Sequence, residues 1–252
     1  MSFVLKDGAI IRDSNYFKIT RIQDIPNLEG WWIPGQGTYE LISPSLDPAE
    51  DGDTVYRWVD TINSRNFDQA AVANRPKYFT NVVNGLPVIR FAASSLENRF
   101  FVNGTLPNSD GTNGASLFVV VKYTGTYPST TNNEGGLYIF GNWVRYPNNL
   151  NTITDVFRSN TTRTFTPTLA INQWRVISVR SKTNLKTFYL NNALQDSTTT
   201  NTYSASTTRY IGYNSLTSFV GDIGDLLYYS RYVTDSERTE IATYLMTKYG
   251  LT

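Results

Sequence analysis

Two aspartates near the C-terminus, Asp222 and Asp225 in the segment GDIGDLLYY, are the first residues to consider for catalysis. A pair of carboxylates hydrolyses a glycosidic bond when both project into one cleft, about 5–10 Å apart. On a regular strand, a separation of three residues sends two side chains to opposite faces, and only a bulge at Gly224 would bring them together. We therefore expect Asp222 at the rim of a strand and Asp225 in polar contact with a neighbouring strand, without catalysis.

A second group of acidic residues lies in the segment DPAEDGD, residues 47–53. Carboxylate oxygens suit Ca²⁺, but the spacing is not that of an EF-hand loop, which needs acids at alternate positions and a glutamate at its end. We therefore favour a solvated acidic loop and expect no cofactor, with a calcium site as the alternative. The ligands of such a calcium site would be Asp47, Glu50, Asp51 and Asp53.

Aromatic and polar side chains gather in two further segments, GNWVRYPNN (141–149) and YTGTYPSTTNN (123–133). Aromatic rings with a polar edge offer flat contact area beside hydrogen-bonding groups, a combination typical of sugar-binding surfaces. The candidate ligand-binding residues are Trp143, Arg145, Tyr146, Asn148, Tyr123 and Tyr127. The alternative is that Trp143 and Tyr146 pack in the interior, since aromatic side chains dominate protein cores.

Residue usage removes whole classes of chemistry. The 252-residue chain has no cysteine and no histidine, which excludes disulfides, thiolate chemistry, histidine-built zinc sites and a Ser-His-Asp triad. Its net charge of +1 comes from scattered lysines and arginines, so we expect neither nucleic-acid binding nor membrane insertion. The first residues lack a basic segment followed by an apolar one, so we expect no signal peptide and synthesis in the cytoplasm.

Short apolar segments separated by turns predict an all-β fold. The 17 tyrosines and the many threonines suit pleated, half-buried surfaces. The clearest strand segments are LPVIRF (86–91), SLFVVVKY (116–123), WRVISVR (174–180) and FVGDIGDLLYY (219–229). KTFYLNNALQD predicts a hairpin, because its turn residues Asn191 and Asn192 tolerate positive φ. Many short strands of this kind indicate a sandwich rather than alternating strands and helices.

The two ends of the chain differ from this pattern. Thr234 and Glu237 have the spacing of a capping box, and the residues after them predict a helix over about 235–249. Its apolar face would carry Ile241, Tyr244 and Leu245, and Gly250 would end it. Residues 1–25 predict an arm or hairpin around Asp7-Gly8, the alternative being the first strands of the main domain. The sandwich domain then spans residues 26–252.

Five segments stand in a recognisable order: EGWWIP (29–34), VYRWVDTINSRNFDQ (55–69), RPKYFTNVVNGLPVIRF (75–91), NQWRVISVRSKTNLKTFYLNN (172–192) and FVGDIGDLLYYSRYVTDSERTEIATYLMTKYG (219–250). This order resembles the concanavalin A-like, or laminin-G-like, jelly-roll superfamily over about residues 28–250. It is most similar to stand-alone modules of bacteriophage proteins. The resemblance implies a two-sheet antiparallel jelly-roll sandwich with an N-terminal arm and one C-terminal helix.

Several motif residues have structural roles in this interpretation. We expect Trp58 and Trp174 in the core between the two sheets, Asp60 to fix a turn through backbone hydrogen bonds, and Arg90 to pair with an acid or with backbone carbonyls. Two turns depart from the pattern of the superfamily: the one at 60–64 lacks glycine, and Asn191-Asn192 stands where Asn-Gly is usual.

The resemblance implies a non-enzymatic component of a virus particle, a bacteriophage capsid decoration or tail-associated protein on the virion surface. Other virion proteins would bind through the N-terminal arm by strand addition, and we expect a homo-oligomer. The second hypothesis is a glycan-binding adhesin that recognises a host surface polysaccharide. The third is a glycoside hydrolase or depolymerase, although this chain lacks the Glu-x-Asp-x-x-Glu strand of the superfamily's hydrolases.

Overall fold

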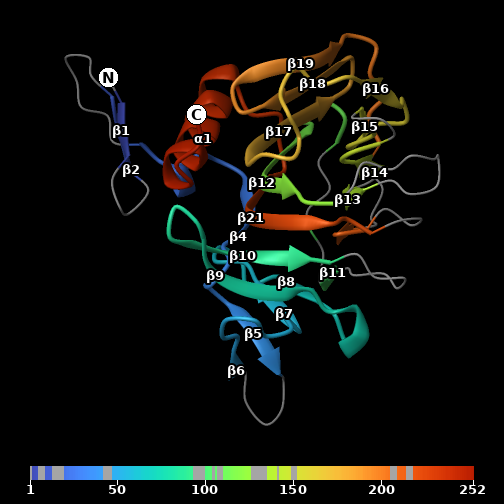
Figure 1. Cartoon of the computed structure of the whole chain (residues 1–252). Coiled ribbons are helices and arrows are strands. Elements are labelled where there is room, and N and C mark those ends of the chain that lie inside the picture. Colours follow the sequence, from blue (N-terminus) through green and yellow to red (C-terminus); the bar gives the residue numbers. More distant parts are fainter. Residues whose placement is uncertain are drawn as a thin grey trace.

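The computed structural model describes residues 2–4, 9–12, 20–41, 47–92, 100–103, 106, 110–125, 135–140, 142–148, 152–204, 209–213 and 218–252. In this part of the chain, two antiparallel sheets pack face to face and the helix α1 (Asp235–Lys248) covers one of them (Figure 1). The expected all-β, two-sheet sandwich with one C-terminal helix is therefore confirmed. None of the described helices is long and apolar enough to cross a membrane.

The first sheet has eight strands. Their order is β19 (Ala193–Thr198), β18 (Leu185–Leu190), β17 (Arg175–Lys182), β12 (Ala115–Tyr123), β21 (Gly221–Tyr229), β10 (Leu86–Phe91) and β9 (Lys77–Val83). The eighth strand, β4 (Leu28–Trp32), lies beside β10 along the same edge of β21. The strands expected from the alternating and continuous apolar segments are all present here.

The second sheet has ten strands. Their order is β16 (Arg163–Phe165), β15 (Ile153–Asp155), β14 (Asn142–Arg145), β13 (Gly136–Phe140), β20 (Arg209–Ile211), β11 (Phe100–Asn103), β8 (Asn66–Asp68), β7 (Arg57–Val59), β5 (Thr38–Leu41) and β6 (Asp47–Pro48). Two short 3₁₀ turns, η1 (Ile22–Asp24) and η2 (Val72–Asn74), lie between strands.

The main hydrophobic core lies between the two sheets, where alternate residues of each strand point inward. Leu117, Val119 and Val121 of β12 belong to this core, together with Trp58 and Phe67 from the other sheet. Trp58 is fully buried, as expected.

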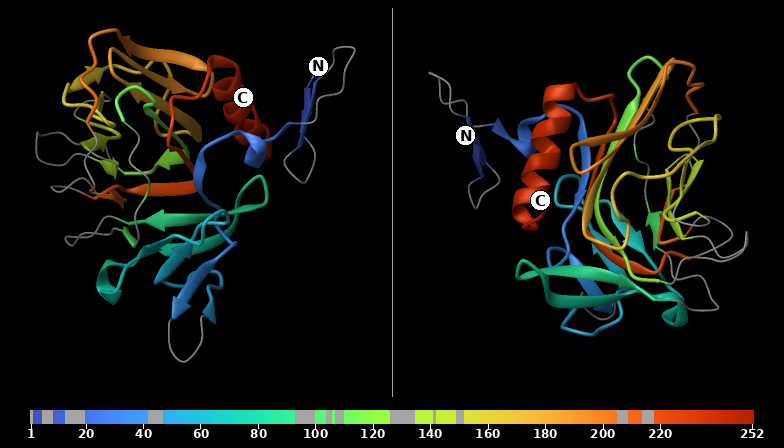
Figure 2. Two further views of the ribbon diagram at one scale, coloured as in Figure 1. Left: turned by 180° about the vertical axis from the view of Figure 1, so that it is seen from behind. Right: turned by 45° about the horizontal axis from the view of Figure 1, so that its top comes forward.

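A second core lies on the outer face of the eight-stranded sheet, under α1 (Figure 2). Phe118 and Val120 of β12 meet Ile241 and Leu245 of the helix there. Because β12 is buried on both faces, its residues form a continuous apolar segment rather than an alternating one. Trp174 belongs to this second core and stacks on Tyr249, so its expected place between the two sheets is wrong.

The helix begins and ends where the sequence predicts. Thr234 accepts a hydrogen bond from the backbone N–H of Glu237, and the Glu237 carboxylate accepts one from the backbone N–H of Thr234. Gly250 adopts the left-handed conformation (φ +64°) after the last turn. The turn of the β18–β19 hairpin is also confirmed, with Asn191 at φ +53°.

The strand β21 contains a bulge. Val119 of β12 pairs with Leu226, whereas Val121 pairs with Ile223. A step of two residues on β12 therefore faces a step of three on β21, which means that β21 carries one extra residue. Ile223 and Leu226 both point into the core between the sheets as a result.

The bulge corrects the expected orientation of the two aspartates. Because the inward residues on either side of the bulge are three apart, Asp222 and Asp225 both lie on the outer face of β21, not on opposite faces. Gly224 gives the bulge its room, since a Cβ at this position would lie 2.7 Å from the ring of Tyr249.

The N-terminal strands form a small third sheet. β1 (Ser2–Val4) pairs with β2 (Ala9–Arg12), and β2 pairs with β3 (Thr20–Arg21). This sheet lies beside α1, outside the sandwich (Figures 1 and 2). Ile22 and Ile25, which follow this sheet in the sequence, are buried in the core under α1.

Candidate functional site

Asp225 is fully buried and connects β21 to α1 and β4. Its carboxylate accepts hydrogen bonds from Trp31 Nε1 (2.9 Å), Lys248 Nζ (2.7 Å) and the Tyr249 hydroxyl (2.7 Å). The Tyr249 hydroxyl in turn accepts from the backbone N–H of Asp225. Burial raises the pKa of Tyr249, and the neighbouring carboxylate raises it further. Asp225 is thus an anchor for the helix, with the expected contact to a neighbouring strand, Trp31, as one of its bonds.

Asp222 is paired with the neighbouring strand β10. Arg90 donates to both oxygens of its carboxylate, at 2.6 and 2.9 Å. This confirms the expected role of Arg90, and the hydrogen bond to Asp222 raises the pKa of the guanidinium. Each aspartate on the outer face of β21 therefore has a cation of its own, and neither carboxylate is left to activate water or attack a sugar.

The acidic loop 47–53 uses its carboxylates to hold its own backbone. Asp53 accepts from the backbone N–H of Glu50 (2.6 Å), and Asp51 accepts from the backbone and side chain of Thr80. The bonds to Thr80 lower the pKa of Asp51. Across the described residues, no three acidic side chains converge on a point that would hold a metal ion. The calcium alternative, which also included Asp47, gains no support from this geometry.

The aromatic candidates divide into buried residues and residues outside the described part. Tyr146 is fully buried, and Tyr123 is nearly so, both in the core between the sheets. Neither ring lies on an exposed surface, and for Tyr146 the alternative of packing in the interior is the one observed. Tyr127 and the side chain of Trp143 lie outside the described residues. Arg145 and Asn148 are described and partly exposed.

The Asp60 turn behaves as expected. Its carboxylate accepts from the backbone N–H groups of Ile62, Asn63 and Arg65. The turn therefore closes without the glycine that the superfamily pattern places there.

One ion pair is buried between the two sheets. Lys186 of β18 donates to the Asp155 carboxylate of β15 at 2.9 Å, and both side chains are only 2 % exposed. Burial lowers the pKa of Lys186, and the attraction of Asp155 opposes that shift. The pair ties the sheets together at their β15–β18 end.

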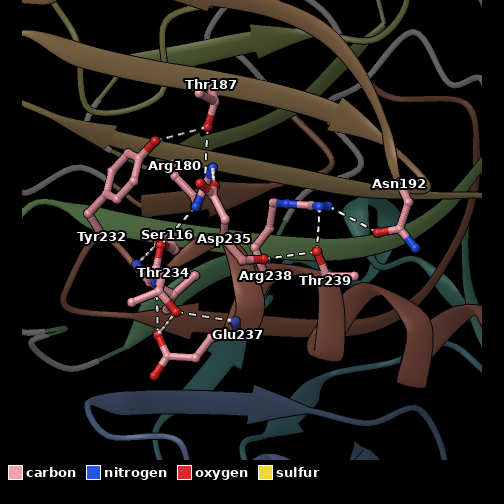
Figure 3. Close-up of polar contacts among 11 residues, drawn as sticks. Ser116, Arg180, Thr187, Asn192, Tyr232, Thr234, Asp235, Glu237, Arg238 and Thr239 are labelled. Carbon is pink, nitrogen blue, oxygen red and sulfur yellow. Dashed lines mark hydrogen bonds and ion pairs between the residues drawn. The ribbon is translucent and has the colours of Figure 1, made fainter. Parts of the chain in front are cut away.

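A cluster of cationic and aromatic side chains lies where the β17–β18–β19 part of the sheet meets the first turn of α1 (Figure 3). We name it the arginine cluster, and it consists of Arg180, Lys182, Thr187, Tyr189, Asn192, Tyr232, Asp235, Arg238 and Thr239. Arg180, which is buried, donates to Asp235 (2.6 Å), the carbonyl of Val233 (2.9 Å) and Thr187 (3.2 Å). Its guanidinium lies 4.5 Å from the ring centroid of Tyr232.

Arg238 is the second buried arginine of the cluster. Its guanidinium lies 4.0 Å from the ring centroid of Tyr189 and donates to Asn192 Oδ1 (3.0 Å) and Thr239 Oγ1 (2.7 Å). Figure 3 shows its side chain directed across the first turn of α1 towards Asn192. Burial lowers the pKa of Arg238, and the like charge of Arg180 lowers it further.

The cluster is electropositive. Among the described residues, Asp235 is paired with Arg180, and the nearby Glu237 is held by Arg231. Lys182 and Arg238 form no ion pair in this part of the chain. The hydrogen bonds from Arg231 lower the pKa of Glu237 to about 2. The positive end of the α1 dipole adds to the same field. An arginine fork of this kind binds carboxylates and phosphates through paired hydrogen bonds.

Sequence reasoning missed this cluster, although one signal was present. Arg238, Ile241, Ala242 and Leu245 share one helix face at helical spacing, so a charged residue stands on the apolar side of α1. A buried-facing cation needs partners from another element. That pattern could have singled out Arg238, but nothing local in the sequence links it to Arg180.

Comparisons with known proteins support the fold. No protein-family model matches the chain, and no curated protein matches it. The binding domain of Paraclostridial Mosquitocidal Protein 1 is similar in structure, with a TM-score of 0.62 and 12% identity, over 90% of this chain and 53% of that one. The binding domain of Botulinum neurotoxin serotype G has a TM-score of 0.57 and 11% identity, over 89% of this chain and 54% of that one.

A third similar structure is a sialidase from Trypanosoma rangeli, with a TM-score of 0.53 and 12% identity over 90% of this chain. The chain spans 34% of the sialidase and about half of each binding domain. At these identities the likeness establishes a shared sheet-rich sandwich fold, which this chain holds with its own set of side chains.

Proposed function

We propose that this protein is a non-enzymatic binding module that recognises a carbohydrate or receptor on a cell surface. The observation that carries the proposal is that both carboxylates on β21 are ion-paired: Asp222 with Arg90, and Asp225 with Lys248. A glycoside hydrolase needs two carboxylates free to act on the same bond. The sandwich instead offers the arginine cluster, which suits binding without chemistry.

The similar structures add support of a weaker kind. Two of them are described as binding domains of toxins, and a sandwich of this shape presents loops and sheet faces to large partners. Under this proposal the ligand is a surface glycan of a host cell. The sialidase is the one enzyme among the three, and it is only partly covered by this chain.

Binding to immobilised bacterial surface polysaccharides tests the proposal directly. We expect retention of the protein on one or more of them and no release of reducing ends during a long incubation. Asp222→Asn, which removes one carboxylate of β21, should leave retention unchanged. The proposal fails if no polysaccharide retains the protein, and its non-enzymatic part fails if reducing ends appear.

The finer placement, a component of a bacteriophage particle, rests on the sequence resemblance and on the small N-terminal sheet. β1 pairs with β2 alone among the described strands, and an unpaired strand edge is able to accept a strand from another subunit. Other virion proteins, or further copies of this chain, would bind there.

Removal of residues 1–21 tests this placement, because Ile22 and Ile25 stay in the core under α1. The truncated chain should keep its cooperative thermal transition but lose incorporation into particles, measured by mass spectrometry of purified virions. Normal incorporation of a folded truncated chain would refute docking through the arm.

A further inference from the structure

Arg238 is a buried cation whose bonds all go to neutral groups. It is 6 % exposed, its Nη atoms donate to the Asn192 amide and the Thr239 hydroxyl, and its Nε has no hydrogen-bond partner. Within the described part of the chain, no carboxylate forms an ion pair with it. Charges that are removed from water are normally paired. The carboxylate of Asp235 attracts the Arg238 guanidinium without forming an ion pair with it, so every direct contact of this cation is with a neutral group.

The other described arginines provide a comparison. Four of them hold a carboxylate through a short ion pair: Arg57, Arg90, Arg163 and Arg231. Arg180, equally buried, is paired with Asp235. Arg175 donates only to carbonyl and amide oxygens, so its partners are neutral like those of Arg238. Arg175, however, remains partly exposed to water. The fully buried Arg158 also donates to a neutral group, the Tyr228 hydroxyl, but that partner lies in the interior. Arg238 combines burial with neutral partners and with a contact to an exposed residue, Asn192.

The Arg238 guanidinium contacts an exposed residue at the β18–β19 turn. Asn192, which covers the guanidinium, is exposed, and its carbonyl oxygen is a neutral acceptor that an ionised one would outcompete. Tyr189, under the guanidinium, is partly exposed and pairs across the strands with Leu194, which is 52 % exposed. Since both side chains lie on the outer face of the hairpin, an apolar platform borders the cation.

We propose that the arginine cluster is a binding site for a carboxylate-bearing sugar. The ligand carboxylate displaces the Asn192 amide oxygen and accepts paired hydrogen bonds from Arg238. The sugar ring lies against Leu194 and the part of Tyr189 that the Arg238 guanidinium does not cover, which supply apolar contact. This assignment rests on the proposed function, for which it names the ligand class: an acidic glycan.

Titration calorimetry with methyl β-glucuronide, methyl β-glucoside and inorganic phosphate tests the site. The glucuronide should bind at least about tenfold more tightly than the uncharged glucoside, because only the former makes the charge-assisted bonds. Arg238→Gln should weaken glucuronide binding by about tenfold or more, whereas Arg175→Gln on the same sheet should leave it unchanged. Leu194→Ser, at an exposed position, should weaken glucuronide binding about threefold without altering phosphate binding.

Each contrary result is informative. Equal affinity for glucuronide and glucoside, or undiminished glucuronide binding in Arg238→Gln, overturns the site. Phosphate that binds as tightly as glucuronide, with no effect of Leu194→Ser, reduces it to an anion site and overturns the sugar assignment. If Arg238→Gln does not fold, Leu194→Ser and the glucoside comparison still decide. Retention on neutral polysaccharides alone would preserve the proposed function while this inference fails.

Discussion

Replacement of Asp225 by asparagine should weaken the attachment of α1 to the sheet and lower the free energy of unfolding. The carboxylate is fully buried and accepts hydrogen bonds from Trp31, Lys248 and Tyr249. Removal of one partner from a buried ion pair costs about 3–5 kcal/mol, because the remaining charge is left uncompensated. Lys248 keeps some access to water, and the asparagine oxygen still accepts one bond, so we expect the lower end, about 3 kcal/mol of unfolding free energy.

Asp222→Asn is a matched control on the same face of the same strand. Its partner Arg90 has a side chain that is 39 % exposed, so water can solvate the guanidinium once the ion pair is lost. Exposed pairs contribute roughly 0–1 kcal/mol, and we expect a loss of about 1 kcal/mol. Urea unfolding followed by tryptophan fluorescence measures both. Equal losses for the two variants would refute the assignment of Asp225 as the anchor of α1.

A double-mutant cycle separates the ion pair from the other bonds of Asp225. If Asp225 and Lys248 stabilise each other, Asp225→Asn combined with Lys248→Met should cost about 1–2 kcal/mol less than the sum of the single losses. Additive losses would assign the stabilisation to Trp31 and Tyr249 instead of Lys248.

Three other features of the structure predict measurable effects. Hydrogen bonds from a neighbouring arginine lower the pKa of Glu237 from an ordinary 4.5 to about 2. The ionised Glu237 therefore stabilises the fold above pH 4.5, and this stabilisation is lost as the pH falls towards 2. Glu237→Gln should flatten the pH dependence of the unfolding free energy between these two values. Lys186→Met should lower the free energy of unfolding by about 3–5 kcal/mol, because it leaves the Asp155 charge unpaired between the sheets. The double variant Lys186→Met with Asp155→Asn should recover part of this loss in the same urea assay. No recovery would contradict the pairing. Gly224→Ala should cost about 1–3 kcal/mol by overpacking against the ring of Tyr249, measured as a lowered thermal midpoint.

The sequence predicts the elements whose signals are local. The capping box at Thr234 and the hairpin at Asn191 depend on residues within a few positions of each other, and both are present as expected. The apolar strands are also predicted, because a buried strand is a short, continuous segment of apolar residues. No local signal predicts the order of the strands in the two sheets, because that order depends on pairings between residues far apart in the sequence.

The errors arise where distant residues decide the outcome. At the bulge in β21, Gly224 lies against the ring of Tyr249, which follows the last residue of the helix. A period-two pattern does not show this contact. Trp174 was assigned to the wrong core because the sheet has two buried faces, and the sequence does not say which face a strand residue takes. Tyr123 and Tyr146 were expected at the surface, whereas packing places both inside.

These errors change where recognition is to be sought. The helix packs on the outer face of β21 and its neighbours, and Asp225 holds it in place through Lys248 and Tyr249. Asp222 instead pairs with Arg90 of the neighbouring strand β10. The exposed part of this face begins at β18 and β19, and Arg238 lies at the boundary, buried by the helix yet within reach of the hairpin surface through Asn192. A cation at such a boundary is held rigidly by the helix and still meets a ligand without a large opening motion, which lowers the entropic cost of binding. If recognition depends on this boundary, variants that loosen α1, such as Asp225→Asn, should weaken acidic-sugar binding as well as stability, whereas Asp222→Asn should affect neither by much.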